Sequence, residues 1–437
     1  MQKLIKWKGE TGRKPLLLKG VRQVGKTHLL KEFGKLHFPQ THYVNFEKEP
    51  HLARIFEPDL NPERILTELS FHLNRPIHKE QDLVIFDEIQ IIPKALTSLK
   101  YFQEDCQELH ICGAGSLLGL YLNTVSFPVG KVTFETLRPI SFEEFLMAGS
   151  DKSLALIQGF TLKDKIPEIV HEHVMEEFKK YLVVGGLPEV VAAYYAHRNN
   201  LFEALVLVRK KQADLLNSYY ADIAKHAGEV NAMHIDRVFR AVPMQLSQVQ
   251  EGSIARFKFK GVIPGVTHYD RLAGAIDWLE AAGLVLKVHI VNTGQLPFKG
   301  YAKENFFKLL LFDVGMLGYM SGLPPKAILE ADYGSYKGYV AENGVAQELI
   351  SYGREELFSW QEGQSEIEFL LEVDAEVVPL EVKSGSRIKA KSLKIFAKKY
   401  KSPLQGIFSI NPLDISSTQG VHYYPLYLAG HFPFLAR

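Results

Sequence analysis

The spacing of apolar and polar residues changes along the chain. Up to about residue 149, short apolar runs alternate with stretches whose apolar residues recur at three- and four-residue spacing. Residues 16–18, 43–46 and 83–86 fit buried strands, and residues 62–73 fit a helix. Such alternation predicts βαβ units, and hence an α/β domain with a parallel sheet and helices on both faces.

Beyond residue 149 the pattern becomes helical and then returns to strands. Residues 172–184, 190–197 and 201–220 carry helical spacing, and two strands are predicted at 366–372 and 377–383. We therefore expect three domains: residues 1–149 as the α/β domain, 150–292 as a helical region, and 293–437 as a C-terminal α+β domain.

Composition narrows the class of protein. A chain of 437 residues is too long for one core. Its formal net charge of +1 gives no global attraction to nucleic acid or membranes. Its longest apolar run has seven residues, whereas a membrane-spanning helix needs roughly 20. The two cysteines cannot form a disulfide framework. We expect a cytoplasmic protein without membrane insertion.

The loop after the first predicted strand carries the clearest chemical signal. It fits the pattern G-x-x-x-x-G-K-[ST], which wraps the phosphates of ATP or GTP. Its glycines permit backbone angles that side chains forbid, and the N–H groups at the start of the following helix point at anions. We expect Lys26 to contact the β- and γ-phosphates and Thr27 to hold Mg²⁺. The predicted nucleotide-binding residues are Gly20, Val21, Arg22, Gln23, Val24, Gly25, Lys26 and Thr27.

Two carboxylates follow the apolar run at residues 83–86. Ligands bind beyond the carboxyl ends of strands in open α/β sheets, so Asp87 and Glu88 should face the loop. We expect Asp87 to help hold Mg²⁺ and Glu88 to orient or deprotonate the attacking water. The alternative is that the pair only caps a helix at an ordinary strand–helix turn.

A further strand is predicted at residues 109–112, between the other two in the sheet. Small residues follow it and end at Ser116. Ser116 could sense the γ-phosphate or place the water. Equally, the small residues could form only a tight turn.

The phosphate-binding loop, the acidic pair at 87–88 and four further short strings of the sequence together resemble the prokaryotic AAA-type ATPases that carry a C-terminal domain of unknown function, DUF4143. The resemblance implies ATP rather than GTP as ligand, ATP hydrolysis, and coupling of the nucleotide state to accessory domains that recognise a partner. The matching strings are GVRQVGKT at 20–27, FDEIQ at 86–90, RPISFEEF at 138–145, GGLP at 185–188, FDVG at 312–315 and EVKSG at 381–385.

The last of these strings also resembles the PD-(D/E)-x-K nucleases, whose fold the family's C-terminal domain is thought to share. The resemblance implies a Mg²⁺ site made by Glu342, Glu368 and Glu381, with Lys383 stabilising developing charge. Glu368 stands where the pattern has Asp, and Mg²⁺ demands near-ideal ligand placement. One alternative is therefore an ATP-gated DNA nuclease, and the other is a degenerate nuclease fold kept for recognition.

The middle region also contains a candidate winged helix-turn-helix. A helix at 235–242 ends at Pro243, and a second helix at 269–282 precedes a strand at 284–291, with Gly283 as its C-cap. The second helix could enter a DNA groove, which would make the protein an ATP-responsive DNA-binding regulator. Because its acidic residues would repel phosphates, a protein partner or a structural role is at least as well supported as DNA binding. A lysine-rich helix from residue 391 could be a solvated face or could follow a phosphate backbone.

Overall fold

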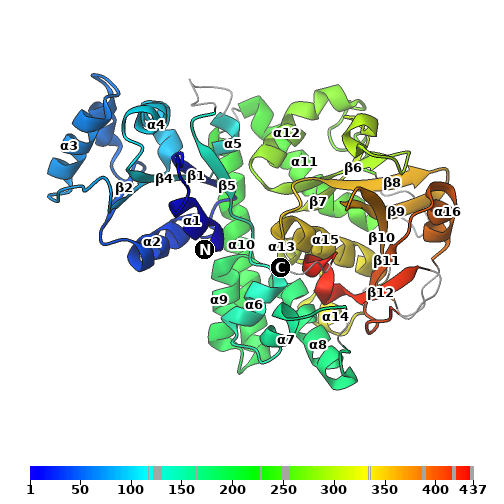
Figure 1. Cartoon of the computed structure of the whole chain (residues 1–437). Helices are drawn as coiled ribbons and strands as arrows, with labels where there is room; N and C mark the ends of the chain where they lie inside the picture. Colours follow the sequence, from blue (N-terminus) through cyan, green and yellow to red (C-terminus); the bar gives the residue numbers. More distant parts are fainter. Residues whose placement is uncertain are drawn as a thin grey trace. The chain divides into compact units, whose positions relative to one another are not determined.

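A parallel sheet forms from the alternating pattern at the start of the chain, as the computed structural model shows (Figure 1). The structure describes residues 1–116, 118–121, 130–162, 165–226, 229–248, 256–332, 334, 336–385, 390–415 and 420–433. The contacts divide the chain into two units. Unit 1 comprises residues 1–138 with 281–283, and unit 2 comprises residues 139–280 with 284–437.

The helices and strands of unit 1 follow one another in βα order, with 3-10 helices labelled η. They are α1 (Gln2–Lys8), β1 (Leu16–Lys19), α2 (Lys26–His37), β2 (Thr41–Asn45), η1 (Pro50–Phe56), α3 (Pro62–His72), β3 (Leu83–Asp87), η2 (Ile89–Ile91), α4 (Pro93–Asp105), β4 (His110–Gly115), α5 (Leu118–Tyr121) and β5 (Thr133–Thr136).

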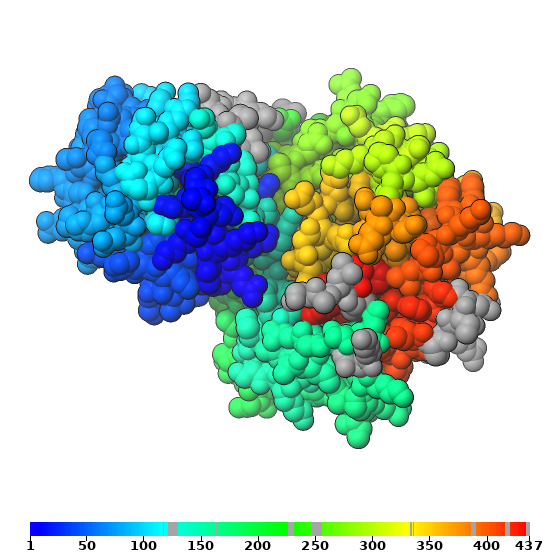
Figure 2. Space-filling view, viewed as in Figure 1, coloured from blue at the N-terminus to red at the C-terminus, as the bar shows by residue number. Residues whose placement is uncertain are grey.

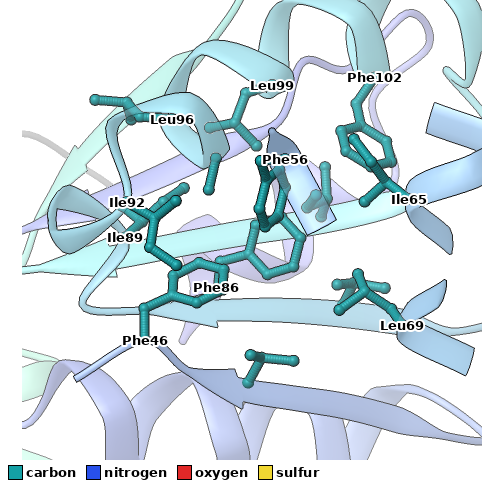
Figure 3. Close-up of a cluster of buried hydrophobic side chains, with 14 of the residues drawn as sticks. Phe46, Phe56, Ile65, Leu69, Phe86, Ile89, Ile92, Leu96, Leu99 and Phe102 are labelled. Atoms are coloured by element: carbon teal, nitrogen blue, oxygen red, sulfur yellow. The ribbon is translucent and has the colours of Figure 1, made fainter. Parts of the chain in front are cut away.

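The sheet of unit 1 has the order β2-β3-β4-β1-β5, and every neighbouring pair is parallel. The expected place of β4 between β1 and β3 is confirmed. One sheet face packs against α3 and α4 in a cluster of buried rings and aliphatic side chains around Phe86, shown in Figure 3. On the other face Leu16, Leu18 and Ile85 pack with residues of α1 and α2. The exposed side of α1 belongs to the dark-blue surface in Figure 2. Both faces are therefore covered, which explains the continuous apolar runs of β1 and β3.

The remaining elements form helices and a second sheet. They are α6 (Phe142–Ala148), α7 (Leu154–Gln158), α8 (Glu168–Val184), α9 (Pro188–His197), α10 (Leu201–His226), α11 (Glu229–Gln248), η3 (Tyr269–Arg271), α12 (Ala273–Ala281), β6 (Val285–Val291), η4 (Phe298–Tyr301), β7 (Phe307–Leu311), α13 (Val314–Met320), α14 (Pro325–Leu329), α15 (Tyr336–Ser351), β8 (Leu357–Glu362), β9 (Ser365–Val373), β10 (Glu376–Val382), α16 (Lys391–Tyr400), β11 (Gln405–Ser409), β12 (Val421–Pro425) and η5 (Leu426–His431).

The second sheet is mixed and has the order β12-β11-β10-β9-β8-β6-β7. Strands β10, β11 and β12 are parallel, whereas β9 is antiparallel to both β8 and β10. Helix α16 packs on β9 and β10 through Leu393 and Phe396, and α15 contacts β7 and β10. The sheet thus brings residues far apart in sequence to neighbouring strands.

Two local predictions differ from the structure. Helix α11 continues through Pro243 instead of ending there. Residues 113–115 extend β4 instead of forming a turn. Neighbouring side chains leave no room for a Cβ at either glycine of this stretch: it would lie 2.6 Å from Leu17 Cδ2 at Gly113 and 2.0 Å from Gln90 Oε1 at Gly115. Glycine therefore serves close packing on the strand.

The winged helix-turn-helix is not confirmed. Gly283 does follow α12 with φ of +75°, and Leu284 N–H donates to Leu279 O, as a helix C-cap does. The next strand, β6, does pair with β7, but it also pairs with β8 inside the larger sheet. A separate wing hairpin would have no such third strand.

The units also differ from the three predicted domains. The expected boundary at residue 149 lies inside unit 2, because α6 packs on α7, α8 and α9. The expected boundary at residue 292 separates β6 from β7, which share a ladder. In the described part of the chain, none of the helices combines the length and apolar character that crossing a membrane requires.

Candidate functional site

The glycine-rich loop joins β1 to α2, and its two glycines adopt the positive φ angles that side chains disfavour. Gly20 has φ of +154°, and a Cβ there would lie 2.4 Å from Leu137 O. Gly25 has φ of +98° and directly precedes α2, which begins at Lys26. Both positions therefore exclude a side chain. The Lys26 ammonium donates to Gly20 O at 2.9 Å and to Val21 O at 2.8 Å, so it lies folded back over the loop.

Asp87 lies directly across from this loop. Thr27 Oγ1 donates to Asp87 Oδ2 at 2.8 Å, which joins the start of α2 to the end of β3. The same oxygen accepts from Tyr43 Oη at 2.7 Å and from Asn45 Nδ2 at 3.3 Å. Asp87 is only 3 % exposed. The structure therefore brings together the hydroxyl and the carboxylate that were predicted to share Mg²⁺.

The sequence predicts a strand at residues 43–46 but assigns no role in the site to Tyr43 or Asn45. Burial, assisted by the Asp87 carboxylate, raises the pKa of Tyr43 to about 12, so its hydroxyl stays protonated and donates. The Lys31 ammonium lies 3.6 Å from the centre of the Tyr43 ring. The sequence signal for these two residues is the polar end of their strand, since ligands bind at the carboxyl ends of strands in open α/β sheets.

Glu88 takes a left-handed backbone conformation, with φ of +52°. Its carboxylate accepts from Gln90 Nε2 at 2.6 Å. Gln90 is 8 % exposed, and its amide oxygen lies against Gly115 at the end of β4. Strained backbone at a carboxylate is typical of functional positions. Gln90 thus orients Glu88, a role that the sequence did not assign. Ser116 follows β4 at the same sheet edge, and its role stays a prediction.

The set predicted in the C-terminal region is partly assembled. Lys383 Nζ lies 2.6 Å from Glu381 Oε1 and 3.6 Å from Glu368 Oε1. Burial, and then the Glu368 carboxylate, raise the pKa of Glu381 to about 7. Glu381 is 3 % exposed, and its Oε2 has no hydrogen-bond partner in the described part of the chain. Burial opposes the charge of Lys383, but Glu368 and Glu381 raise its pKa above the ordinary value.

The fourth member, Glu342 on α15, is bound to a residue that sequence reasoning missed. The Lys308 ammonium of β7 donates to Glu342 Oε1 at 2.9 Å and also forms an ion pair with Glu366. Lys308 is 2 % exposed. Burial opposes its charge, but the carboxylates of Glu342 and Glu366 raise its pKa above the ordinary value. Only the contact between β7 and α15, two elements distant in sequence, reveals this lysine.

Glu342, Glu368 and Glu381 do not bring three carboxylate oxygens within 4.8 Å of one another. Within the ranges that the structure describes, the set of three metal-ligand atoms lying within 4.8 Å of one another comes from Glu49, His51 and His72. His51 and His72 are exposed, and His72 Nε2 lies 2.7 Å from Glu49 Oε2.

Several strings of the resemblance meet inside unit 2. Gly185 has φ of +76°, and a Cβ there would lie 2.2 Å from Asp313 Oδ1. Asp313 Oδ2 accepts from Gly186 N at 2.6 Å, and Oδ1 accepts from Met316 N at 2.9 Å. Burial raises the pKa of Asp313 to about 6. The GGLP and FDVG strings are therefore explained by a buried contact and a helix cap.

A second buried acid joins the remaining string to this region. Glu348 Oε1 accepts from Phe142 N at 3.0 Å and from Tyr181 Oη at 2.9 Å. Tyr181 Oη also donates to Ile140 O at 2.8 Å. Burial raises the pKa of Glu348 to about 8. The RPISF segment thus anchors α6 to α8 and α15.

Family models cover most of the chain in three pieces. An AAA domain matches residues 12–146, a domain of unknown function (DUF8612) matches residues 175–327, and a domain of unknown function (DUF4143) matches residues 337–428. The first and last are the two domains that the sequence resemblance named, in the same order. A comparison with curated proteins found no match.

The solved structures that match this chain are distant in sequence, and their TM-scores lie below 0.5. A Walker-type ATPase of Pyrococcus abyssi is 14% identical, with a TM-score of 0.45, and the match covers 73% of this chain and 93% of that chain. The RuvB Holliday junction branch migration motor of Thermotoga maritima is 18% identical, with a TM-score of 0.29, over 65% and 85% of the two chains. Cdc6p from Pyrobaculum aerophilum is 12% identical, with a TM-score of 0.27, over 73% and 88%.

Proposed function

Because the chain belongs to the AAA-type P-loop ATPases with a C-terminal DUF4143 domain, we propose that it binds ATP with Mg²⁺ and hydrolyses it at the carboxyl edge of the unit 1 sheet. The observation that carries the proposal is the 2.8 Å contact between Thr27 Oγ1 and Asp87 Oδ2. It joins two residues that lie far apart in sequence, and each supplies the hard oxygen that Mg²⁺ prefers.

The loop supplies the groups that bind phosphate. N–H groups at the start of α2 point toward the loop, and Lys26 is the first residue of that helix. On binding, the Lys26 ammonium exchanges the carbonyls of Gly20 and Val21 for phosphate oxygens. Mg²⁺, held by Thr27 and through Asp87, would neutralise charge on the phosphates.

Glu88 is proposed as the catalytic carboxylate. It accepts a proton from a water molecule, whose oxygen forms a bond to the γ-phosphorus while the bond from that phosphorus to the bridging oxygen breaks. The products are ADP and phosphate. Gln90, bonded to Glu88 at 2.6 Å, is the positioning residue. We further propose that the nucleotide state controls what unit 2 binds.

The first test separates binding by the loop from nonspecific binding. Lys26→Ala should abolish binding of a fluorescent ATP analogue. Lys35→Ala, an exposed change on the same helix, should leave it unchanged. Equal affinity in the two variants would contradict the assignment of the loop.

A second candidate function is a Mg²⁺-dependent nuclease in unit 2. The order α15-β8-β9-β10-α16-β11 and the E-x-K residues at the end of β10 agree with the nuclease-like resemblance. The specific observation is the unpartnered Oε2 of buried Glu381 beside Glu368, within the described part of the chain. A buried oxygen without a partner is costly and would be satisfied by a cation. The bond from Lys308 to Glu342 weighs against a three-carboxylate site.

Plasmid cleavage decides between an active and a degenerate nuclease site. Purified protein is incubated with plasmid and Mg²⁺, with and without ATP, beside Lys383→Ala. Activity that disappears in the variant supports the nuclease. Activity that survives the change comes from elsewhere, and no cleavage by the wild type indicates the degenerate fold.

A further inference from the structure

A cavity of about 400 Å³ lies in unit 2, and its lining residues do not include Glu342, Glu368, Glu381 or Lys383. Arg237, Arg240 and Met244 of α11 line one side, and Lys258, Lys260 and Val262 line the other. This volume falls within the usual range of ligand pockets, roughly 300–1,000 Å³. The cavity combines an apolar part with four cationic side chains.

Its two walls are fixed to each other. Gln245 Nε2 on α11 donates to Lys258 O at 2.7 Å, and Gln245 Oε1 accepts from Lys258 N at 2.8 Å. Phe257 N donates to Phe307 O at 2.9 Å, which ties the second wall to β7, and α11 also packs on β7 (Figure 1). These contacts use the backbone of Lys258, so the Lys258 side chain is not needed to hold the two walls together.

The charge in this cavity is largely uncompensated. Asp236 forms an ion pair with Arg240 at 2.9 Å, and Arg240 also lies 4.1 Å from the Tyr220 ring centre. Across the parts of the chain that are described, Arg237, Lys258 and Lys260 have no carboxylate within 4.0 Å. Lys258 and Lys260 are exposed at the rim. Clustered cations without acidic partners favour a polyanion.

We propose that this cavity binds the phosphate backbone of a nucleic acid. Lysines at the rim suit phosphate groups as point charges, and Met244 and Val262 offer an apolar surface for a sugar or base. Entry of helix α12 into a DNA groove was one of the alternatives left open by the sequence. The helix exposes Asp277 and Glu280, which would repel phosphates. The proposal goes beyond ATP hydrolysis and does not depend on it, since the proposed ATP site lies in unit 1.

The test uses the full chain, once without nucleotide and once with Mg²⁺ and ATP, because we propose that the nucleotide state controls what unit 2 binds. Anisotropy of a short fluorescein-labelled DNA duplex of random sequence measures binding between roughly 50 and 200 mM salt. Lys258→Glu/Lys260→Glu changes two exposed side chains and leaves the Gln245 contacts to the backbone intact. Lys394→Glu/Lys398→Glu on α16 makes the same charge change on another exposed lysine pair of unit 2.

We expect the pocket variant to lower the affinity at least about 10-fold and to reduce the salt slope by about two, because each lost phosphate contact removes about one from that slope. The α16 variant should bind like the wild type, and melting curves should show that both variants are folded. Absent binding by the wild type at the lowest salt would overturn the proposal. An equal loss in the two variants, or a loss only in the α16 variant, would overturn it too.

Discussion

Asp87 shows how single side chains define the proposed ATP site. Its Oδ2 accepts from Thr27, Tyr43 and Asn45, and its Oδ1 accepts from Glu88 N at 3.2 Å. A carboxylate held on both oxygens keeps one orientation, which matters for an ion with strict octahedral geometry. Tyr43 and Asn45 are therefore positioning residues.

Tyr43→Phe removes one of these donors and keeps the ring. We expect the Mg²⁺ concentration needed for half-maximal ATP hydrolysis to rise by about 10-fold, as happens when partners of metal ligands are lost. ATP binding without Mg²⁺ should change little. A titration of activity with Mg²⁺ measures the effect, with Tyr101→Phe on α4 as the matched control. An unchanged requirement for Mg²⁺ would remove Tyr43 from the site.

Single helices and strands can be predicted from the local spacing of apolar residues and glycines, whereas the contacts between them cannot. The strand β1, the helix α2 and the acidic end of β3 could be predicted because each shows its own periodicity or glycine signal. The extension of β4 through Gly115 depends on Gln90, which belongs to another element. The pairing of Lys308 with Glu342 depends on a contact between β7 and α15. Spacing along the chain carries no information about such contacts.

Glu348 should make the stability of the packing around α15 depend on pH. Its ordinary pKa is 4.5, and burial raises the folded value to about 8. The stability that the neutral form contributes is therefore fully present below pH 4.5 and is lost as the pH rises through 8.

Glu348→Gln should keep the contacts to Phe142 and Tyr181 and remain neutral at every pH. The free energy of unfolding of this variant, relative to the wild type, should therefore rise between pH 5 and pH 9 by about 4 kcal/mol. Denaturant unfolding at several pH values measures it, with the exposed Glu330→Gln as control. A constant difference across this range would show that Glu348 titrates normally.

At the scale of the whole molecule, the proposed chemistries belong to different units. All residues of the proposed ATP site lie within residues 1–138. The predicted nuclease-like set (Glu342, Glu368, Glu381 and Lys383) and the cationic cavity lie in unit 2. With a formal net charge of +1, the whole chain does not attract nucleic acid. Any such binding must come from a local concentration of charge.

This division predicts how the ligand affects thermal unfolding. ADP at about 100 times its dissociation constant stabilises the state that binds it by about 2.7 kcal/mol. In calorimetry we expect the transition of unit 1 to move upward while that of unit 2 stays in place. Lys26→Ala should abolish the shift. An equal upward shift of both transitions would contradict independent unfolding of the two units.

The identity of the nucleotide that stays bound after incubation with Mg²⁺ and ATP tests the proposed ATPase most directly. Wild-type protein should hold ADP. Glu88→Gln should hold ATP and turn it over at least about 100-fold more slowly, because the carboxylate that accepts the proton is gone. ADP in the variant at the wild-type rate would contradict hydrolysis through Glu88 at this site.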